Sequence, residues 1–212
     1  IALALRDGLD RPAFVSALVP PDRTLATRVR GHLQRWGIEP DDSAGLQLHE
    51  TPTFKFARIV LDLVSSRIDH FDLLALLHHP LCLLGLDEAT RQRGRAFLDL
   101  EVLRRTASGQ GLTPLQDWLR ANPSQPGAPQ AHAVLDRVAA ATRALRETAE
   151  RPNDDPCWTA FDWLLATIEC VEALTQSPDE AVGSVAWTQN GSEAMVAFVN
   201  EWAQALTERG LS

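Results

Sequence analysis

The chain has 212 residues, 45% of them hydrophobic, which is enough to bury the core of one or two domains. Its formal net charge is -8 at pH 7, and no apolar run is long enough to span a bilayer. The first residues lack the basic and apolar pattern of a secretory signal peptide. We therefore expect a soluble protein of the cytoplasm that has no membrane partner.

Charge is distributed unevenly along the chain. Residues 1–106 carry 14 basic and 14 acidic side chains, whereas residues 107–212 carry 6 and 14. Because contacts with phosphate need Lys and Arg, the acidic second half is a poor candidate for holding nucleic acid. The neutral first half has enough basic residues to form a local basic patch.

A strand followed by a helix is predicted near the start. The run 14–19 is almost continuously apolar, which is typical of a parallel strand buried on both faces. A helix follows, with Asp22 as its N-cap and Gly37 at its C-terminal stop. Its apolar stripe consists of Leu25, Val29 and Leu33. A turn then leads to a second short strand near 44–48.

The loop between this strand and this helix occupies a place where many proteins bind phosphate. A helix N-terminus offers free N–H groups and the positive end of the helix dipole. However, no Gly or Lys lies between Val19 and Thr24, and Pro20 and Pro21 each lack an N–H. A structural role is therefore favoured over a nucleotide site.

Helices dominate the rest of the chain. Apolar residues at helical spacing predict helices over 54–64, 69–77, 87–106, 134–145, 158–171 and 195–206, and we expect the aromatic residues of the last two to pack in the core. The stretch 121–130 is rich in Pro, Gly, Asn and Ser, as linkers are. The fold class is thus α/β but predominantly helical, with one or two short parallel strands in a β-α start followed by a multi-helix body.

Several residue pairs invite a catalytic or metal-binding interpretation. His78 and His79 are adjacent, so on a helix they point about 100° apart and cannot easily bind one ion. The pairs at 41–42 and 154–155 are both Asp-Asp beside prolines, where Asp commonly caps a turn. Lys55 has no nuclease-like carboxylate partner, and none of the common catalytic motifs is present. We expect no catalytic residue, no metal site and no autonomous enzyme.

The cysteines also argue against a metal or disulfide framework. Cys82, Cys157 and Cys170 are odd in number, have no CxxC spacing and lie in apolar neighbourhoods. We expect them to be buried free thiols in a reducing compartment.

The opening segment resembles a known family. Residues 17–29 (ALVPPDRTLATRV), 33–38 (LQRWGI), 41–45 (DDSAG) and Thr51-Pro52 are similar in order and spacing to the AddB subunit of bacterial double-strand-break repair helicase-nucleases. The Leu-rich segment 73–81 with its His-Pro and the Trp/Gly/Glu stretch 187–193 continue the resemblance more thinly.

This resemblance implies a place within a larger protein. An AddB parent is a helicase-like chain with a C-terminal nuclease domain, and it works on broken DNA beside an AddA partner in a complex that uses ATP and Mg²⁺. Residues 1–50 would begin the second helicase-like core domain, 51–120 would form the first part of a helical insertion, 121–130 a linker and 131–212 an acidic helical segment. Since the chain starts at Ile1, we expect it to be an excised piece.

The resemblance also bears on the loop before the first predicted helix. In active relatives this loop supplies an Arg to the ATP phosphates, whereas here Pro21 stands at that place and is followed by Asp22. The resemblance therefore implies a degenerate nucleotide-contact loop and no cofactor bound by this chain itself.

Contacts with DNA are the remaining site prediction. The candidate residues are Arg23, Arg28, Lys55, His78, Arg91 and Arg95. Arg91 and Arg95 belong to an Arg-rich helix that extends to Arg105, for which a solvated face is favoured over a phosphate-contacting patch. We expect a non-catalytic AddB-type module that acts as scaffold and as part of a DNA path. The alternative is a stand-alone helical adaptor that binds another protein through the acidic second half.

Overall fold

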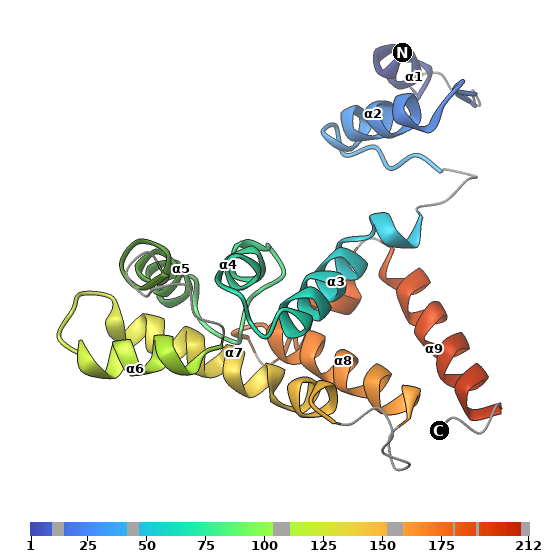
Figure 1. Ribbon diagram of the computed structural model, residues 1–212. Coiled ribbons are helices and arrows are strands. Elements are labelled where there is room, and N and C mark those ends of the chain that lie inside the picture. Colours follow the sequence, from blue (N-terminus) through green and yellow to red (C-terminus); the bar gives the residue numbers. More distant parts are fainter. Residues whose placement is uncertain are drawn as a thin grey trace. The chain divides into compact units, whose positions relative to one another are not determined.

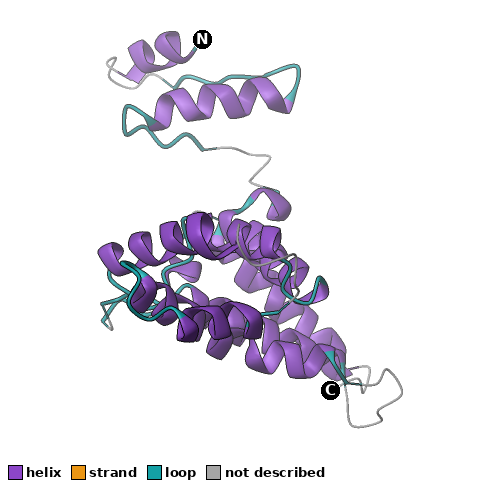
Figure 2. Cartoon of the chain, turned by 60° about the vertical axis from the view of Figure 1, so that its left-hand side comes forward, coloured by secondary structure: helices purple, strands orange, loops and turns teal. Residues whose placement is uncertain are grey.

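The computed structural model describes residues 1–9, 15–41, 47–103, 111–151, 159–179, 181–189 and 191–208. The described residues form nine α-helices and no named strand (Figures 1 and 2). This confirms the predominantly helical fold. The chain divides into two compact units, Ile1–Leu46 and Gln47–Ser212, which are described separately below.

The first unit contains helices α1 (Ala2–Leu9) and α2 (Arg23–Gln34). The predicted N-cap of α2 is confirmed, because the Asp22 carboxylate accepts the Leu25 N–H at 2.8 Å. The predicted stop is also confirmed: Gly37 has a φ of +70°, and the next N–H, of Ile38, returns to the Leu33 carbonyl at 3.1 Å. No helix was predicted over α1.

The predicted short strands are not found among the described residues. Residues 15–20 adopt no regular structure, and Val15 and Val19 are 90% and 91% exposed rather than buried on both faces. Pro20 and Pro21 favour extended backbone, but extended backbone becomes a strand only when a neighbouring strand pairs with it. Of the second predicted strand, 44–46 lie outside the described residues and Leu48 begins a 3-10 helix.

The second unit is entirely helical in its described part. Its elements are the 3-10 helix η1 (Leu48–Glu50), α3 (Pro52–Ser65), α4 (His70–His78), α5 (Glu88–Phe97), the π-helical turn η2 (Leu98–Leu103), α6 (Thr113–Ala121), α7 (Ala128–Ala149), α8 (Ala160–Leu174), the 3-10 helix η3 (Val185–Thr188) and α9 (Ser192–Glu208). The helix predicted from Asp87 to about 106 corresponds to α5 and η2, and Asp87 caps it by accepting the Thr90 N–H at 2.9 Å. No helix was predicted over α6.

Helix α7 is the centre of this unit. It packs against α3, α5, α6 and α8 (Figure 1). Its buried residues recur every three or four positions and are Ala128, Ala131, Val134, Leu135, Val138, Thr142, Leu145 and Thr148. A stripe of this spacing runs along the whole length of a helix, so α7 can contact several neighbours at once.

The stretch predicted as a linker lies between α6 and α7. Helix α6 ends at Ala121 and α7 begins at Ala128, so only six residues separate them. The helices on the two sides of this stretch pack against one another, and both belong to the second compact unit.

Two helices leave large apolar residues exposed. In α3 the buried residues include Phe56, Val60 and Leu63, whereas Leu61 is exposed. In α9 Phe198 and Trp202, expected in the core, are 39% and 42% exposed. Both helices have more apolar residues than one buried face can hold, so their neighbours decide which face is covered.

Helices α5 and α7 approach each other at a glycine. A Cβ atom built on Gly94 would lie 2.6 Å from the carbonyl oxygen of Gln130 and 2.8 Å from Cγ2 of Val134. A Cβ on Gly127, which has a φ of +104°, would lie 2.9 Å from Cδ2 of Phe97. Glycine at these two positions therefore permits the close packing of α5 on the start of α7.

Hydrogen bonds between distant residues join the ends of the second unit. Thr53 at the start of α3 donates its hydroxyl to the Ala186 carbonyl in η3 at 2.6 Å. The N–H groups of Leu83 and Leu84 both donate to the Leu174 carbonyl at the end of α8, at 3.0 and 2.9 Å. These buried bonds fix the α4–α5 connection and η3 against α8 and α3.

We predict that Gly94→Ala lowers the free energy of unfolding by about 1–3 kcal/mol, because the added methyl meets backbone atoms of α7 that cannot rotate away. Chemical denaturation of the chain measures this loss. Gly31→Ala in α2 is the control, since nothing lies within 4 Å of its built Cβ. That variant should gain up to about 1 kcal/mol from helix propensity. A gain at Gly94 as well would contradict the close approach.

Candidate functional site

The start of α2 is the position that the sequence relates to nucleotide contact. The carboxylate of Asp22 already accepts one of the free N–H groups there, at 2.8 Å from Leu25. Pro20 and Pro21 contribute no N–H. A phosphate at this helix end would meet a carboxylate of the same charge and too few donors. The geometry is that of a capped structural turn.

The predicted DNA contacts are divided between the two units. Arg23 and Arg28 are exposed on α2 in the first unit, and Lys55 on α3 and His78 at the end of α4 are exposed in the second. Arg23 and Arg28 share helix α2, while Lys55 and His78 directly adjoin Phe56 and His79, whose rings lie 5.0 Å apart. Exposure leaves them accessible to a large partner.

Arg91 and Arg95 of α5 have a more internal position. Both are only partly exposed, and Arg91 forms an ion pair with Glu88 one turn earlier. Both lie near the Cys82 thiol, and their positive charge slightly opposes the rise of its pKa. These two arginines are thus partly occupied with the protein's own structure, while Arg104 and Arg105 lie outside the described residues.

Two thiols lie in the core behind α5. Cys82 and Cys170 are both free and buried, and burial raises the pKa of each to about 12. The neighbouring Cys82 thiol adds to the shift at Cys170, so the two lie close enough to influence each other. At neutral pH both are protonated and poorly nucleophilic. This confirms the expectation of buried free thiols for these two, whereas Cys157 lies outside the described residues.

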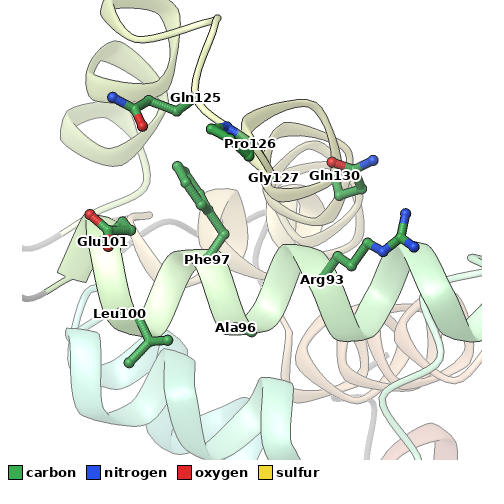
Figure 3. A pocket seen from close by; sticks show the side chains of 9 residues that line it. All are labelled: Arg93, Ala96, Phe97, Leu100, Glu101, Gln125, Pro126, Gly127 and Gln130. Carbon is green, nitrogen blue, oxygen red and sulfur yellow. The ribbon is translucent and has the colours of Figure 1, made fainter.

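A hollow of about 660 Å³ lies between α5, η2 and the start of α7 (Figure 3). It is lined by Arg93, Ala96, Phe97, Leu100, Glu101, Gln125, Pro126, Gly127 and Gln130. Arg93 and Glu101 stand at opposite ends with Phe97 between them. Eight residues of helix separate them, roughly 12 Å along its axis, so their charges do not converge on one small group. The hollow lacks the convergent polar groups of a catalytic site.

His79 is a structural residue at the end of α4. Its Nδ1 accepts the Leu81 N–H at 3.2 Å, and its ring lies 5.0 Å from the ring of Phe56. Burial lowers its pKa below the ordinary value of 6.5, which favours the neutral ring that can accept this bond. His78 beside it is exposed, so the two rings have different surroundings.

One surface was missed by reasoning from sequence. The exposed Phe198 and Trp202 lie one turn apart on α9, with ring centroids 6.0 Å apart. Their helical spacing alone predicted that both residues are buried in the core. The sequence signal for exposure is that the apolar positions of α9 are spread around the helix, so one buried face cannot hold them all.

The described part of the chain contains no group of three His, Cys, Asp or Glu side chains placed to hold a metal ion. None of its helices is both long and apolar enough to cross a membrane. Comparison with protein-family models, curated proteins and solved structures finds no match to this chain. The fold and the surfaces above therefore carry the functional argument.

We predict that the free energy of unfolding falls as the pH drops from about 7 to about 5, because the unfolded chain binds a proton at His79 more readily than the folded chain. The contribution of His79 is complete above its ordinary pKa of 6.5 and is lost as the pH falls through the lowered folded value. Denaturant titrations at several pH values measure this.

His79→Asn keeps an acceptor near Nδ1 and does not titrate, so it should flatten this part of the profile. His78→Asn, at an exposed neighbour, should leave the profile unchanged. The lowered pKa values of Asp87 and Asp162 act only below about pH 4 and do not interfere. An unaltered slope in His79→Asn would show that His79 is not the group responsible.

Proposed function

We propose that this chain is a non-catalytic scaffold module of an AddB-type subunit of an ATP-dependent helicase-nuclease that repairs double-strand breaks by homologous recombination. The observation that carries the proposal is the capped start of α2, where Asp22 occupies the Leu25 N–H and Pro21 stands in place of an Arg. A loop of this kind keeps the helix in place without contacting ATP. The resemblance over the opening segment supplies the family.

The second unit supports a scaffold role. Its core is continuous from α3 to η3, and buried bonds such as that from Thr53 to Ala186 join residues 133 positions apart. A body tied together in this way holds its surfaces in a fixed arrangement. In the proposed complex, ATP and Mg²⁺ act elsewhere, the partner is an AddA-type subunit, and the location is the cytoplasm.

Contact with DNA is the second part of the proposal. Arg28 and Lys55 are exposed, as are Arg23 and His78, whereas Arg91 is paired with Glu88. Exposed cations bind phosphate without reading sequence, so these residues would guide DNA rather than recognise it.

A protein-protein adaptor is the alternative function. The exposed Phe198 and Trp202 on α9 favour it, because exposed aromatic residues that adjoin each other are typical of protein interfaces. An adaptor surface and a scaffold role are compatible within one complex.

We predict that Asp22→Ala, in the full-length subunit assembled with its AddA-type partner, lowers stability by about 0.5–2 kcal/mol through loss of the cap. ATP turnover should remain within about twofold of the unmodified complex, since no step of hydrolysis uses this loop. Thermal unfolding and steady-state ATPase measurements give the two values. Asp87→Ala removes a comparable cap on α5 and is the matched control. A tenfold or greater fall in turnover for Asp22→Ala alone would place the loop at the ATP site and refute the proposal.

We predict that Arg28→Gln and Lys55→Gln together weaken binding of the same complex to duplex DNA at moderate salt. If both residues contact phosphate, the slope of log K against log salt should fall by about 2, or roughly 0.9 for each contact. Fluorescence anisotropy over a salt series measures the slope. Arg137→Gln with Arg143→Gln removes two exposed arginines of α7 and should leave it unchanged. Equal slopes for the two pairs of variants would contradict the proposed DNA path.

A further inference from the structure

Helix α9 carries an apolar stripe that the rest of the described chain leaves uncovered. Its inward side includes Ser192, Val199 and Leu206, and the first and last of these are buried. Ala194, Phe198, Trp202 and Ala205 follow one another at spacings of four, four and three residues, and all four are exposed. This spacing places them along one side of the helix. We call these four residues the α9 flank, and α9 lies at the edge of the second unit in Figure 1.

The charged side chains of α9 that border the flank are acidic, whereas α3, which also packs against α9, carries the exposed cations Lys55 and Arg58. Glu201 follows Phe198 by three residues and Glu208 follows Ala205 by three, so each carboxylate borders the flank. Both are exposed, as are Glu169 and Glu172 on α8, the neighbouring helix. Residues 152–208 contain ten acidic residues and no Lys, Arg or His. No cation of this segment is available to neutralise the carboxylates.

We propose that the α9 flank binds a basic amphipathic helix of a partner protein. Apolar side chains of that helix would pack on Phe198 and Trp202, while Lys or Arg residues beside them would face Glu201 and Glu208. Phe198 and Trp202 keep about two fifths of their surface exposed, so a partner that covers them would bury further aromatic area. This proposal deepens the adaptor role above and does not depend on the AddB resemblance.

The charge selects this occupant over others. Nucleic acid and anionic lipid headgroups carry the same sign as the border of the flank and are repelled by it. A second copy placed flank to flank would oppose Glu201 and Glu208 with identical carboxylates. A basic helix satisfies both the apolar and the charged part of the surface.

The test uses the full chain and a labelled peptide of about 20 residues, long enough to form a helix on binding. One peptide has Leu on one face and Lys beside it, and its twin replaces every Lys with Glu. We expect the Leu/Lys peptide to bind saturably and the Leu/Glu peptide not to bind. Trp202→Ala should weaken binding roughly 30-fold, as for a central aromatic anchor. Glu201→Lys, which leaves the apolar side chains in place, should weaken it about three- to tenfold.

Phe71→Ala is the matched control, because Phe71 on α4 is 82% exposed and has no part in the flank. It should leave the affinity unchanged, and circular dichroism should show all variants folded. Equal loss in Phe71→Ala, equal binding of both peptides, or full affinity in both Trp202→Ala and Glu201→Lys would overturn the proposal. So would a concentration-dependent oligomer of the unmodified chain that Trp202→Ala abolishes, since the occupant would then be a second copy. Unchanged ATP turnover and DNA binding of Trp202→Ala in the assembled complex would show that the scaffold role does not require the α9 flank. The two proposals are then tested independently of each other.

Discussion

The packing of α5 on α7 is the constraint on which the second unit depends. At Gly94 the two helices are so close that a methyl group would collide with the Gln130 carbonyl. The stripe of α7 from Ala131 to Leu145 is buried, and both α5 and α8 pack against this helix. Since α7 contacts four other helices, a displacement of α5 would loosen the body as a whole. The lack of a side chain at Gly94 therefore determines how closely α5 packs on α7, and through α7 it affects much of the core.

Local signals in the sequence predicted most of the described helices, although not α1 or α6. Asp22 and Asp87 precede their helices and cap them, and Gly37 ends α2, because each of these effects acts within a few residues. Thr159 with Asp162 forms a capping box at α8 that sequence reading could have used and did not.

The arrangement of elements needed information from distant parts of the chain. The apolar run before Pro20 suggests a buried strand, yet a strand requires a partner that local composition does not specify. Leu61 and Trp202 are apolar at helical spacing, and only the packing of α3 and α9 decides that both are exposed. The pairing of Arg91 with Glu88 is different, because the two residues stand three apart on one helix and this local spacing is visible in the sequence.

The two halves of the chain differ in the charge that they present to a partner. Cations such as Arg28 and Lys55 are exposed in the first half, whereas the segment that forms α8 and α9 carries carboxylates alone. A polyanion drawn to the cations is repelled by that segment, so the negative surface confines where it can lie. In the proposed interaction, the same carboxylates would draw a basic helix toward Phe198 and Trp202, which would supply the apolar contact that electrostatics at long range cannot. Under the two proposals, separation of charge along the chain would thus let a scaffold hold two classes of partner without competition between them.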